Sequence, residues 1–139
     1  MTDEAIPPDD PSIANTHTVL RRLHPSWMQK DSSGVRHLQS NAFQDMTDPD
    51  GVRAMSMFVE ERLIALGRSA SDLVQQLDGW GVVAVSVEVV RGCGLTLAWA
   101  ANTLDGIDGQ AHVHVFGKKT GSIQKRLVAA SKPIVWPPA

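Results

Sequence analysis

The run GVVAVSVEVV at residues 81–90 constrains the fold more than any other feature, because it is rich in β-branched side chains and apolar on both faces. Such a run is typical of a central strand, whose two faces are both covered. Two later stretches, LTLAWA at 95–100 and AHVHVF at 111–116, alternate as half-buried strands do. A helical pattern over 122–132, with Ser122 as its cap, follows them. The sequence therefore predicts an α+β fold in which two to three helices pack on a small mixed or antiparallel sheet.

The length and composition of the chain indicate a single folded domain. Its 139 residues, 42% of them hydrophobic, suffice for a single core. Residues 1–17 hold three prolines, four acidic residues and no apolar periodicity, so we expect a disordered acidic tail before a domain over 18–139. TVLRRL, ended by Pro25, fits a short strand or one to two helical turns. Helical spacing is also present over 55–67, whose start fits a strand as well, and over 69–77.

Charge and cysteine content narrow the function classes. The formal charge is −2, yet no acid follows Asp108 while five basic residues do, so the C-terminal part is a local cationic patch. No aromatic residues interleave with that patch, which argues against a nucleic-acid module beyond a few phosphate contacts. Cys93 is the single cysteine, and no signal pattern or membrane-length apolar run is present. We expect a cytoplasmic protein without a membrane segment.

The turn GKKTGS at residues 117–122 has the composition of an anion site. Lys118, Lys119 and Thr120 supply donors, and Ser122 opens a helix whose free N–H groups attract negative charge. Three residues separate the two glycines and Ser follows the second, so the turn is not a P-loop. The alternative is a basic turn followed by an ordinary serine cap.

The HVH triplet suggests a metal site. His112 and His114, two residues apart on a strand, project to the same face and are able to share a zinc or iron ion. The sequence does not identify the third ligand that a catalytic metal needs. The candidates are His24, His37, Asp105 and Asp108. Alternatively, the two imidazoles line the solvated face of an edge strand.

The segment from His24 to Met46 reads as a long irregular loop, punctuated by DSSG and fixed by Trp27 and Phe43 as apolar anchors. Cys93, between two glycines after the central strand, fits either a nucleophile or a close-packing position.

Arg21, Arg22, His24, Ser40 and Glu60 follow the order of residue types in an ADP-ribosyltransferase site, and this is a resemblance of type and order only. It implies that Arg22 or His24 contacts NAD, that Ser40 orients the dinucleotide and that Glu60 polarises the ribose. In that family the glutamate lies on or next to a late strand, whereas Glu60 falls on a predicted helix.

A second resemblance spans almost all of the chain after residue 17. RRLHP, then SNAFQD, then MS, with GKKT near the end, is similar to a set of small bacterial proteins that share this pattern. The resemblance carries no activity. It implies that the opening segment and the basic turn belong to one architecture and meet in space.

Three hypotheses follow. The first is an accessory or interaction protein that binds a protein partner or an anionic ligand through the 24–46 loop and the 117–122 turn. The second is a small enzyme acting on a nucleotide, NAD or a nucleic-acid phosphate, with Arg22, His24 and Ser40 as catalytic candidates. The third is a metal-binding protein centred on His112 and His114. The sequence identifies no cofactor.

Overall fold

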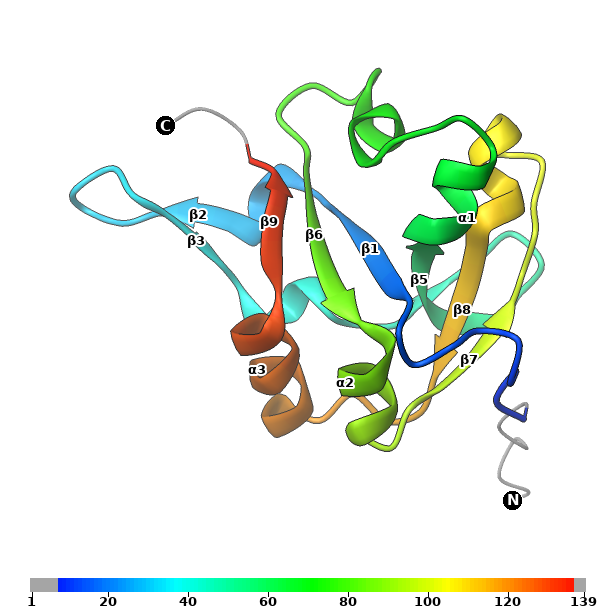
Figure 1. The fold of residues 1–139 in the computed structure, drawn as a ribbon. Helices are drawn as coiled ribbons and strands as arrows, with labels where there is room; N and C mark the ends of the chain where they lie inside the picture. Colours follow the sequence, from blue (N-terminus) through cyan, green and yellow to red (C-terminus); the bar gives the residue numbers. More distant parts are fainter. Residues whose placement is uncertain (1–7, 137–139) are drawn as a thin grey trace.

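An antiparallel sheet of seven strands forms the centre of the computed structural model, which describes residues 8–136 (Figure 1). Six strands lie in the order β7-β8-β5-β1-β6-β9, and β4 pairs with β5. The strands are β1 (Thr18–Leu23), β4 (Met46–Thr47), β5 (Arg53–Val59), β6 (Gly81–Ser86), β7 (Thr96–Trp99), β8 (His112–Phe116) and β9 (Lys132–Val135). A separate ribbon pairs β2 (Met28–Lys30) with β3 (Arg36–Leu38). The predicted α+β single domain is confirmed, and its sheet is antiparallel.

The apolar run at 81–90 folds as two elements. Its first half is β6, which lies between β1 and β9 as a central strand should. Its second half is the helix α2 (Val87–Gly92), so a strand over the whole run is wrong. The Ser86 side chain accepts a hydrogen bond from the Val89 N–H, and Glu88 lies in the first turn, so the helix start is capped and favoured by charge.

The segment 55–67 also divides. Residues up to Val59 form β5, and the helix α1 (Glu60–Ala65) begins immediately after it. Met55, Met57 and Val59 alternate with Ser56 and Phe58, so the two sets of side chains face opposite sides of the sheet. The expected helical spacing holds only from Glu60 onward, and TVLRRL takes the strand alternative as β1.

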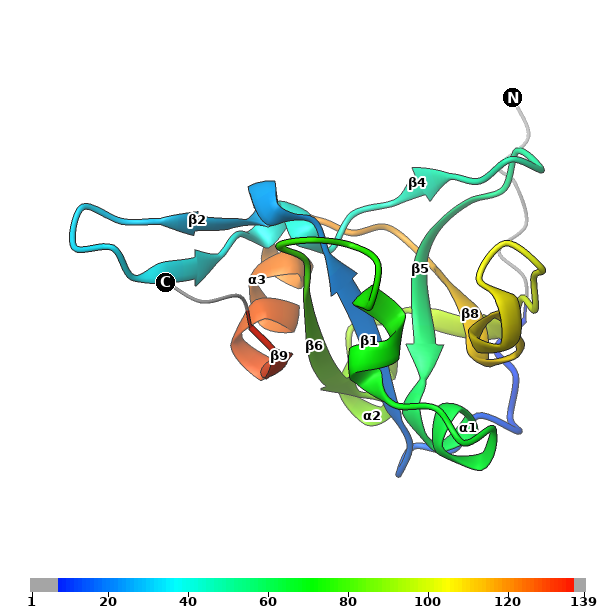
Figure 2. The same cartoon turned by 90° about the horizontal axis from the view of Figure 1, so that it is seen from above.

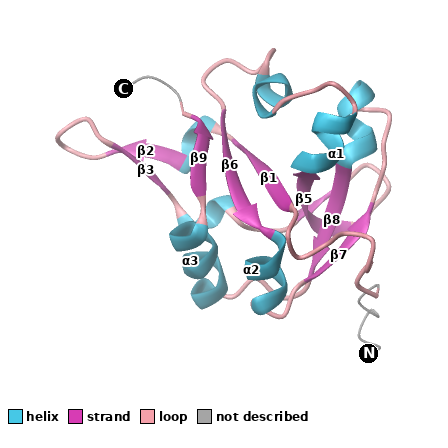
Figure 3. Ribbon diagram, in the orientation of Figure 1, coloured by secondary structure: helices cyan, strands magenta, loops and turns pink. Residues whose placement is uncertain are grey.

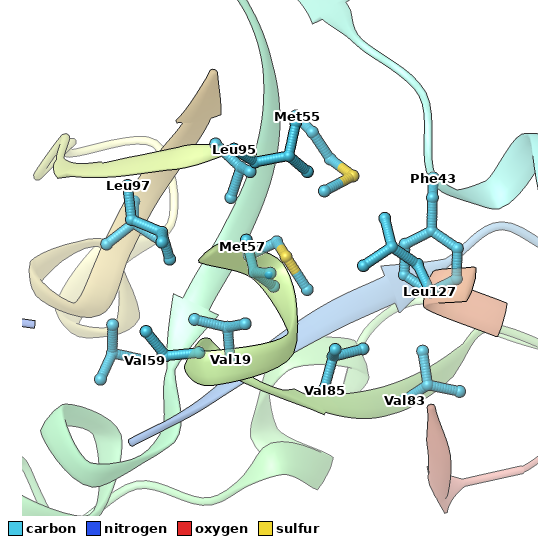
Figure 4. Close-up of a cluster of buried hydrophobic side chains, with 14 of the residues drawn as sticks. Val19, Phe43, Met55, Met57, Val59, Val83, Val85, Leu95, Leu97 and Leu127 are labelled. Carbon is cyan, nitrogen blue, oxygen red and sulfur yellow. The ribbon is translucent and has the colours of Figure 1, made fainter. Parts of the chain in front are cut away.

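Each face of the sheet has its own apolar cluster. One face packs with α2 and with α3 (Gly121–Ala130), and its methionine, valine and leucine side chains meet Phe43 and Leu127 (Figure 4). The other face packs Leu20 and Phe58 with Leu63 of α1 and with the 3₁₀ helix η3 (Ala70–Val74). The helices lie around the sheet rather than in one layer (Figure 3). A further 3₁₀ helix, η4 (Gly106–Ala111), leads into β8.

The main helix, α3, starts before its expected cap. Thr120 is the N-cap, because its side chain accepts a hydrogen bond from the Ile123 N–H. Ser122 is therefore not the cap; it is an exposed residue in the first helical turn. The helix ends at Ala130, and β9 follows as an edge strand that contains Pro133.

Only part of the predicted acidic tail lies within the described residues. From residue 8 to 17 the chain packs on the domain: Ile13 is fully buried, the Asp10 N–H donates to the Leu97 carbonyl, and Asp9 accepts from the Leu97 N–H. Asp9 also forms an ion pair with Arg91 at 3.0 Å. This stretch therefore belongs to the folded domain rather than to a tail, because its acids and Ile13 have partners in it. Residues 1–7 lie outside the described part.

The expected loop 24–46 contains the β2–β3 ribbon, which extends away from the main sheet (Figure 2). The 3₁₀ helices η1 (Pro25–Trp27) and η2 (Ser40–Ala42) stand at its base. Phe43 is fully buried, as predicted for an anchor, and Trp27 is half-buried. Within residues 8–136, no helix has the length and apolar character that crossing a membrane requires.

Candidate functional site

A cleft lies on the face of the sheet that carries Ser56 and Phe58. It consists of two adjoining cavities of about 310 and 700 Å³ that share Arg22, Asp48, Ser56 and His114 as lining residues. The smaller cavity is lined by Arg21, Arg22, His24, Trp27, Met46, Thr47, Asp48, Ser56, Phe58, Trp80 and His114. The larger one extends between the turn 48–52 and the loop 100–105 and reaches His112. These volumes are in the range of ligand pockets, which is about 300–1,000 Å³.

The smaller cavity sits where β1 and β5 separate. The two strands pair at Val19–Val59 and Leu20–Phe58, whereas β1 stays paired with β6 as far as Leu23. β4 pairs with the beginning of β5, at Ala54 and Arg53. Between these two pairings the backbone of β5 has no strand partner on that side. We call this opening between β1 and β5 the fork.

Arg21 fills the fork. Its guanidinium donates to the carbonyls of Ala42 at 3.0 Å, Ser56 at 2.8 Å and Gln44 at 3.4 Å, which replaces the missing strand pairing. The residue is only 4% exposed, and burial, together with the charge of Arg22, lowers its pKa to about 10. It stays charged at neutral pH. Within residues 8–136 no carboxylate lies at ion-pair distance from it, although the charge of Asp45 acts on it and opposes the lowering of its pKa.

Arg22 lies on the opposite side of β1, over the cleft. Its guanidinium carbon is 4.8 Å from the centre of the Phe58 ring, and Nη1 lies 3.0 Å from the Asp105 carboxylate. The side chain is 28% exposed. This arrangement places the guanidinium over an aromatic ring while the side chain stays partly exposed.

His24 stands at the end of the smaller cavity with a defined tautomer. Its Nδ1 accepts a hydrogen bond from the Ser26 N–H, which is a donor only, so the proton of the neutral imidazole is on Nε2. Nε2 is therefore a donor in either charge state. The ring lies edge-on to Trp80 at 5.3 Å and tilted to Trp27 at 6.0 Å. His24 thus adds a donor beside two indoles.

Asp48 is fixed by a tight turn. Its Oδ1 accepts from the N–H groups of Asp50 and Val52, both at 2.9 Å, and Gly51 has φ 82°, a conformation that favours glycine. Oδ2 remains for His114, whose Nε2 is 3.4 Å away. Burial, followed by the charge of His112, lowers the pKa of His114, and Asp48 opposes the shift. His114 is therefore neutral near pH 7.

The two histidines of the HVH triplet do lie on one face, with ring centres 5.1 Å apart. His112 is buried; its Nδ1 donates to the Ala100 carbonyl at 2.7 Å, and its ring packs edge-on against Phe58. In the part of the chain from residue 8 to 136, no three His, Cys, Asp or Glu side chains are grouped as a metal site requires. The pair has no third ligand there, and the metal hypothesis stays a prediction.

The loop 100–105 forms the far wall of the cleft. Its shape depends on a close approach, because a Cβ on Gly109 would lie 2.0 Å from the Asn102 carbonyl oxygen. The Asn102 side chain accepts from the Asp105 N–H, which places Asp105 opposite Arg22. Asp108 is buried and pairs with Arg68 at 2.8 Å, which ties the loop to the end of α1.

The basic turn lies away from the cleft and is used differently from the expectation. Lys119 is buried, with Nζ 2.6 Å from an Asp45 carboxylate oxygen and donating to the Val115 carbonyl. Thr120 is the cap of α3, so its hydroxyl is engaged. Lys118 and Ser122 are exposed. The Lys119–Asp45 ion pair joins the turn to the 24–46 loop, as the second resemblance implies.

The other predicted residues are dispersed. Ser40 lies on η2, which packs against α3, while Arg22 and His24 line the cleft. Glu60 starts α1 and lines a separate hollow beside β9. The residue set of the ADP-ribosyltransferase resemblance is therefore not brought together. Cys93 is the half-buried C-cap of α2 and packs against the core.

The segments of the second pattern are linked by contacts. Arg21 of RRLHP binds carbonyls of SNAFQD and of Ser56 in MS, and Asp45 of SNAFQD pairs with Lys119 of GKKT. No family model, no curated protein and no solved structure matches the chain. Any function must therefore be argued from the geometry of this chain itself.

Several residues of the cleft escaped prediction from the sequence. Asp48 and Ser56 had no assigned role, and Trp80 was not considered. One signal was present: DPDGV at 48–52 repeats the form of DSSGV at 31–35, and in both turns the aspartate accepts from two backbone N–H groups. In both, its second oxygen faces a histidine, His37 at 2.7 Å or His114 at 3.4 Å.

Proposed function

We propose that the protein binds a small anionic ligand that carries a planar ring, such as a nucleoside phosphate, in the cleft. The observation that carries the proposal is the Arg22 guanidinium, which lines both cavities of the cleft, lies over the Phe58 ring and belongs to a partly exposed side chain. A cation on the wall of a cleft attracts a ligand of the opposite charge.

The donor groups of the cleft also favour an anion. Arg22 presents a partly exposed guanidinium, and His24 presents an Nε2–H donor. A planar guanidinium fork is suited to phosphate or carboxylate oxygens, which it binds through two hydrogen bonds. Asp105, which pairs with Arg22, is the group that such an anion would replace.

The apolar part of the lining favours a ring. Trp27, Phe58 and Trp80 border the smaller cavity, and His24 stands between the two indoles. Aromatic walls next to cationic donors are the usual composition of sites for ligands with a flat apolar part and a charged part. A nucleoside phosphate has both parts.

The proposal keeps the anionic ligand of the first hypothesis and moves its site from the 117–122 turn to the cleft. The 24–46 segment still contributes, through His24, Trp27 and Met46. Lys119 has its own carboxylate partner, so its charge is already neutralised. A protein partner stays a separate prediction.

Isothermal calorimetry with AMP, adenosine and inorganic phosphate tests the proposal. We expect AMP to bind more tightly than either of its parts, because only AMP uses both the cations and the aromatic wall. Arg22→Gln removes a charge-assisted hydrogen bond and should weaken AMP binding about 10- to 100-fold.

Lys118→Gln is the matched control, since it removes an exposed cation from the basic turn and should leave AMP affinity unchanged. Loss of binding in Lys118→Gln with retention in Arg22→Gln would place the anion at the turn and refute the cleft. Absence of binding by AMP, adenosine and phosphate alike would refute this ligand class.

A further inference from the structure

Ser56 and His114 are direct neighbours across the β5–β8 pair. The register sets Ser56 opposite His114, and both side chains line both cavities of the cleft. Directly opposed residues of antiparallel strands have Cβ atoms about 4.5–5.5 Å apart. The Ser56 hydroxyl makes no hydrogen bond to any of residues 8–136, so it is available to a ligand.

Asp48 lies beside His114 in the cleft. One carboxylate oxygen is held by two backbone N–H groups of its turn, and the other lies 3.4 Å from Nε2 of His114. This contact is one of charge and proximity, and the His114 side chain is only 12% exposed.

We propose that the cleft hydrolyses phosphate esters, with Ser56 as the nucleophile, His114 as the general acid and base, and Asp48 as a positioning residue. This inference rests on the proposed function, because the phosphate must first be bound by the Arg22 side of the cleft. A hydroxyl directly across from a histidine, with a carboxylate near that histidine, supplies the groups on which covalent hydrolysis depends.

The reaction has two balanced steps. In the first, His114 takes the Ser56 hydroxyl proton, Oγ forms a bond to phosphorus, and the ester P–O bond breaks; the leaving alcohol takes the proton from His114. In the second, His114 takes a proton from water, the water oxygen attacks phosphorus, and the Ser56 Oγ–P bond breaks with return of that proton to Oγ. Water is the only co-reactant.

The surroundings suit this chemistry. Arg22, which lines the same two cavities as Ser56, supplies donors to the phosphoryl oxygens as their charge grows. Burial lowers the pKa of His114, which keeps the imidazole in its basic form near pH 7. Asp48 and His112 are the charged or titratable groups that act on it most strongly.

Release of p-nitrophenol from bis(p-nitrophenyl) phosphate and p-nitrophenyl phosphate tests the inference. We expect saturable hydrolysis of at least one of them. Ser56→Ala and His114→Gln should each lower the rate about 100-fold or more. Lys118→Gln, purified identically, should match the wild type. Intact mass analysis of the quenched reaction should show a phosphoryl adduct that Ser56→Ala lacks.

Asp48→Asn separates positioning from mere structural support. Since Asp48 raises the pKa of His114, its removal should shift the acidic limb of the rate profile, where the rate rises with pH, to lower pH and reduce the maximal rate. A reduced rate with an unmoved pH profile would assign Asp48 to the turn alone and overturn its positioning role.

The outcomes are distinguishable from those of the proposed function. AMP binding retained in Ser56→Ala, together with no phosphate ester hydrolysis by the wild type, would overturn the catalytic inference and leave ligand binding intact. Hydrolysis of p-nitrophenyl acetate but of neither phosphate ester would overturn the phosphate assignment. Absence of AMP binding would overturn both.

Discussion

Arg21 and Arg22 are adjacent in the chain and have different roles. Arg21 is buried in the fork and donates to three carbonyls, whereas Arg22 lies over Phe58 and stays partly exposed. The difference follows from strand alternation, which sends neighbouring side chains to opposite faces. Structural support and ligand recognition are thus divided between two identical side chains.

Arg21→Met should destabilise the fold. The substitution keeps an apolar stem but leaves the carbonyls of Ala42 and Ser56 without their donor, so we expect a loss of about 2–4 kcal/mol in the free energy of unfolding. Urea denaturation followed by circular dichroism measures it. Arg62→Gln, an exposed change on α1, is the control and should stay within about 0.5 kcal/mol of the wild type. An equally small effect of Arg21→Met would show that the fork does not need the guanidinium.

At this scale the sequence predicts little of the site. Strand alternation predicts that the side chains of Arg21 and Arg22 point to opposite faces of the sheet. It does not predict which of the two is buried, because that depends on where β5 separates from β1. His24 is a candidate site residue in the sequence, but its tautomer follows from a backbone contact that no residue pattern contains.

Among the elements, the contact between the 24–46 segment and the turn before α3 is the most consequential. Asp45 and Lys119 form an ion pair at 2.6 Å, and the Lys119 side chain is only 3% exposed. Burial lowers the pKa of Lys119, and Asp45 partly offsets that shift. The pair therefore fastens the base of the β2–β3 ribbon to the main sheet.

Asp45→Asn alone should lower the free energy of unfolding more than removal of both charges of the pair does. It leaves a buried ammonium without its counter-charge, which costs about 3–5 kcal/mol. In Asp45→Asn with Lys119→Met the unpaired charge is gone, and the double variant should unfold at a higher urea concentration than Asp45→Asn alone. A double variant less stable than both single variants would contradict this account of the contact.

Helices and strands could be predicted where the apolar pattern was long. The prediction failed where a local signal interrupted the pattern. The strands within 81–90, 95–100 and 111–116 were predicted, since alternation or β-branching extends over each, although only the first half of 81–90 is a strand. The helix α2 was missed because its valines continue the strand composition, and only the Ser86 cap marks the change.

In the whole molecule, the described N-terminal segment closes one border of the sheet. Asp10 and Asp9 bond the backbone of β7 at Leu97, and Ile13 enters the apolar cluster beneath. An acidic, proline-containing segment has the composition of a tail, and this long-range docking gives it order.

Ile13→Ala should therefore lower the free energy of unfolding by about 2–5 kcal/mol, as for other buried aliphatic side chains. Urea denaturation checks the value, with Val35→Ala on the exposed β2–β3 turn as the control. A change below about 0.5 kcal/mol would mean that the segment is not part of the cooperative unit.

The cleft is formed by the tertiary fold and not by any single segment of the chain. Its lining comes from the strands β1, β5 and β8, from the turn that follows β4, and from the residue that precedes β6. It therefore depends on pairings between segments far apart in the chain. Composition and spacing identified the cationic and histidine-bearing segments separately, but the order of the strands decides which of them meet.

The most direct test of ligand binding in the cleft uses the four tryptophan indole N–H resonances in a ¹⁵N–¹H spectrum during titration with AMP. Trp27 and Trp80 line the smaller cavity, whereas Trp99 donates to Ser12 and Trp136 packs on the other face. We predict saturable shifts of the Trp27 and Trp80 resonances, with Trp99 and Trp136 unmoved. Unmoved Trp27 and Trp80 at saturating AMP, or shifts confined to Trp99 and Trp136, would contradict the proposed site.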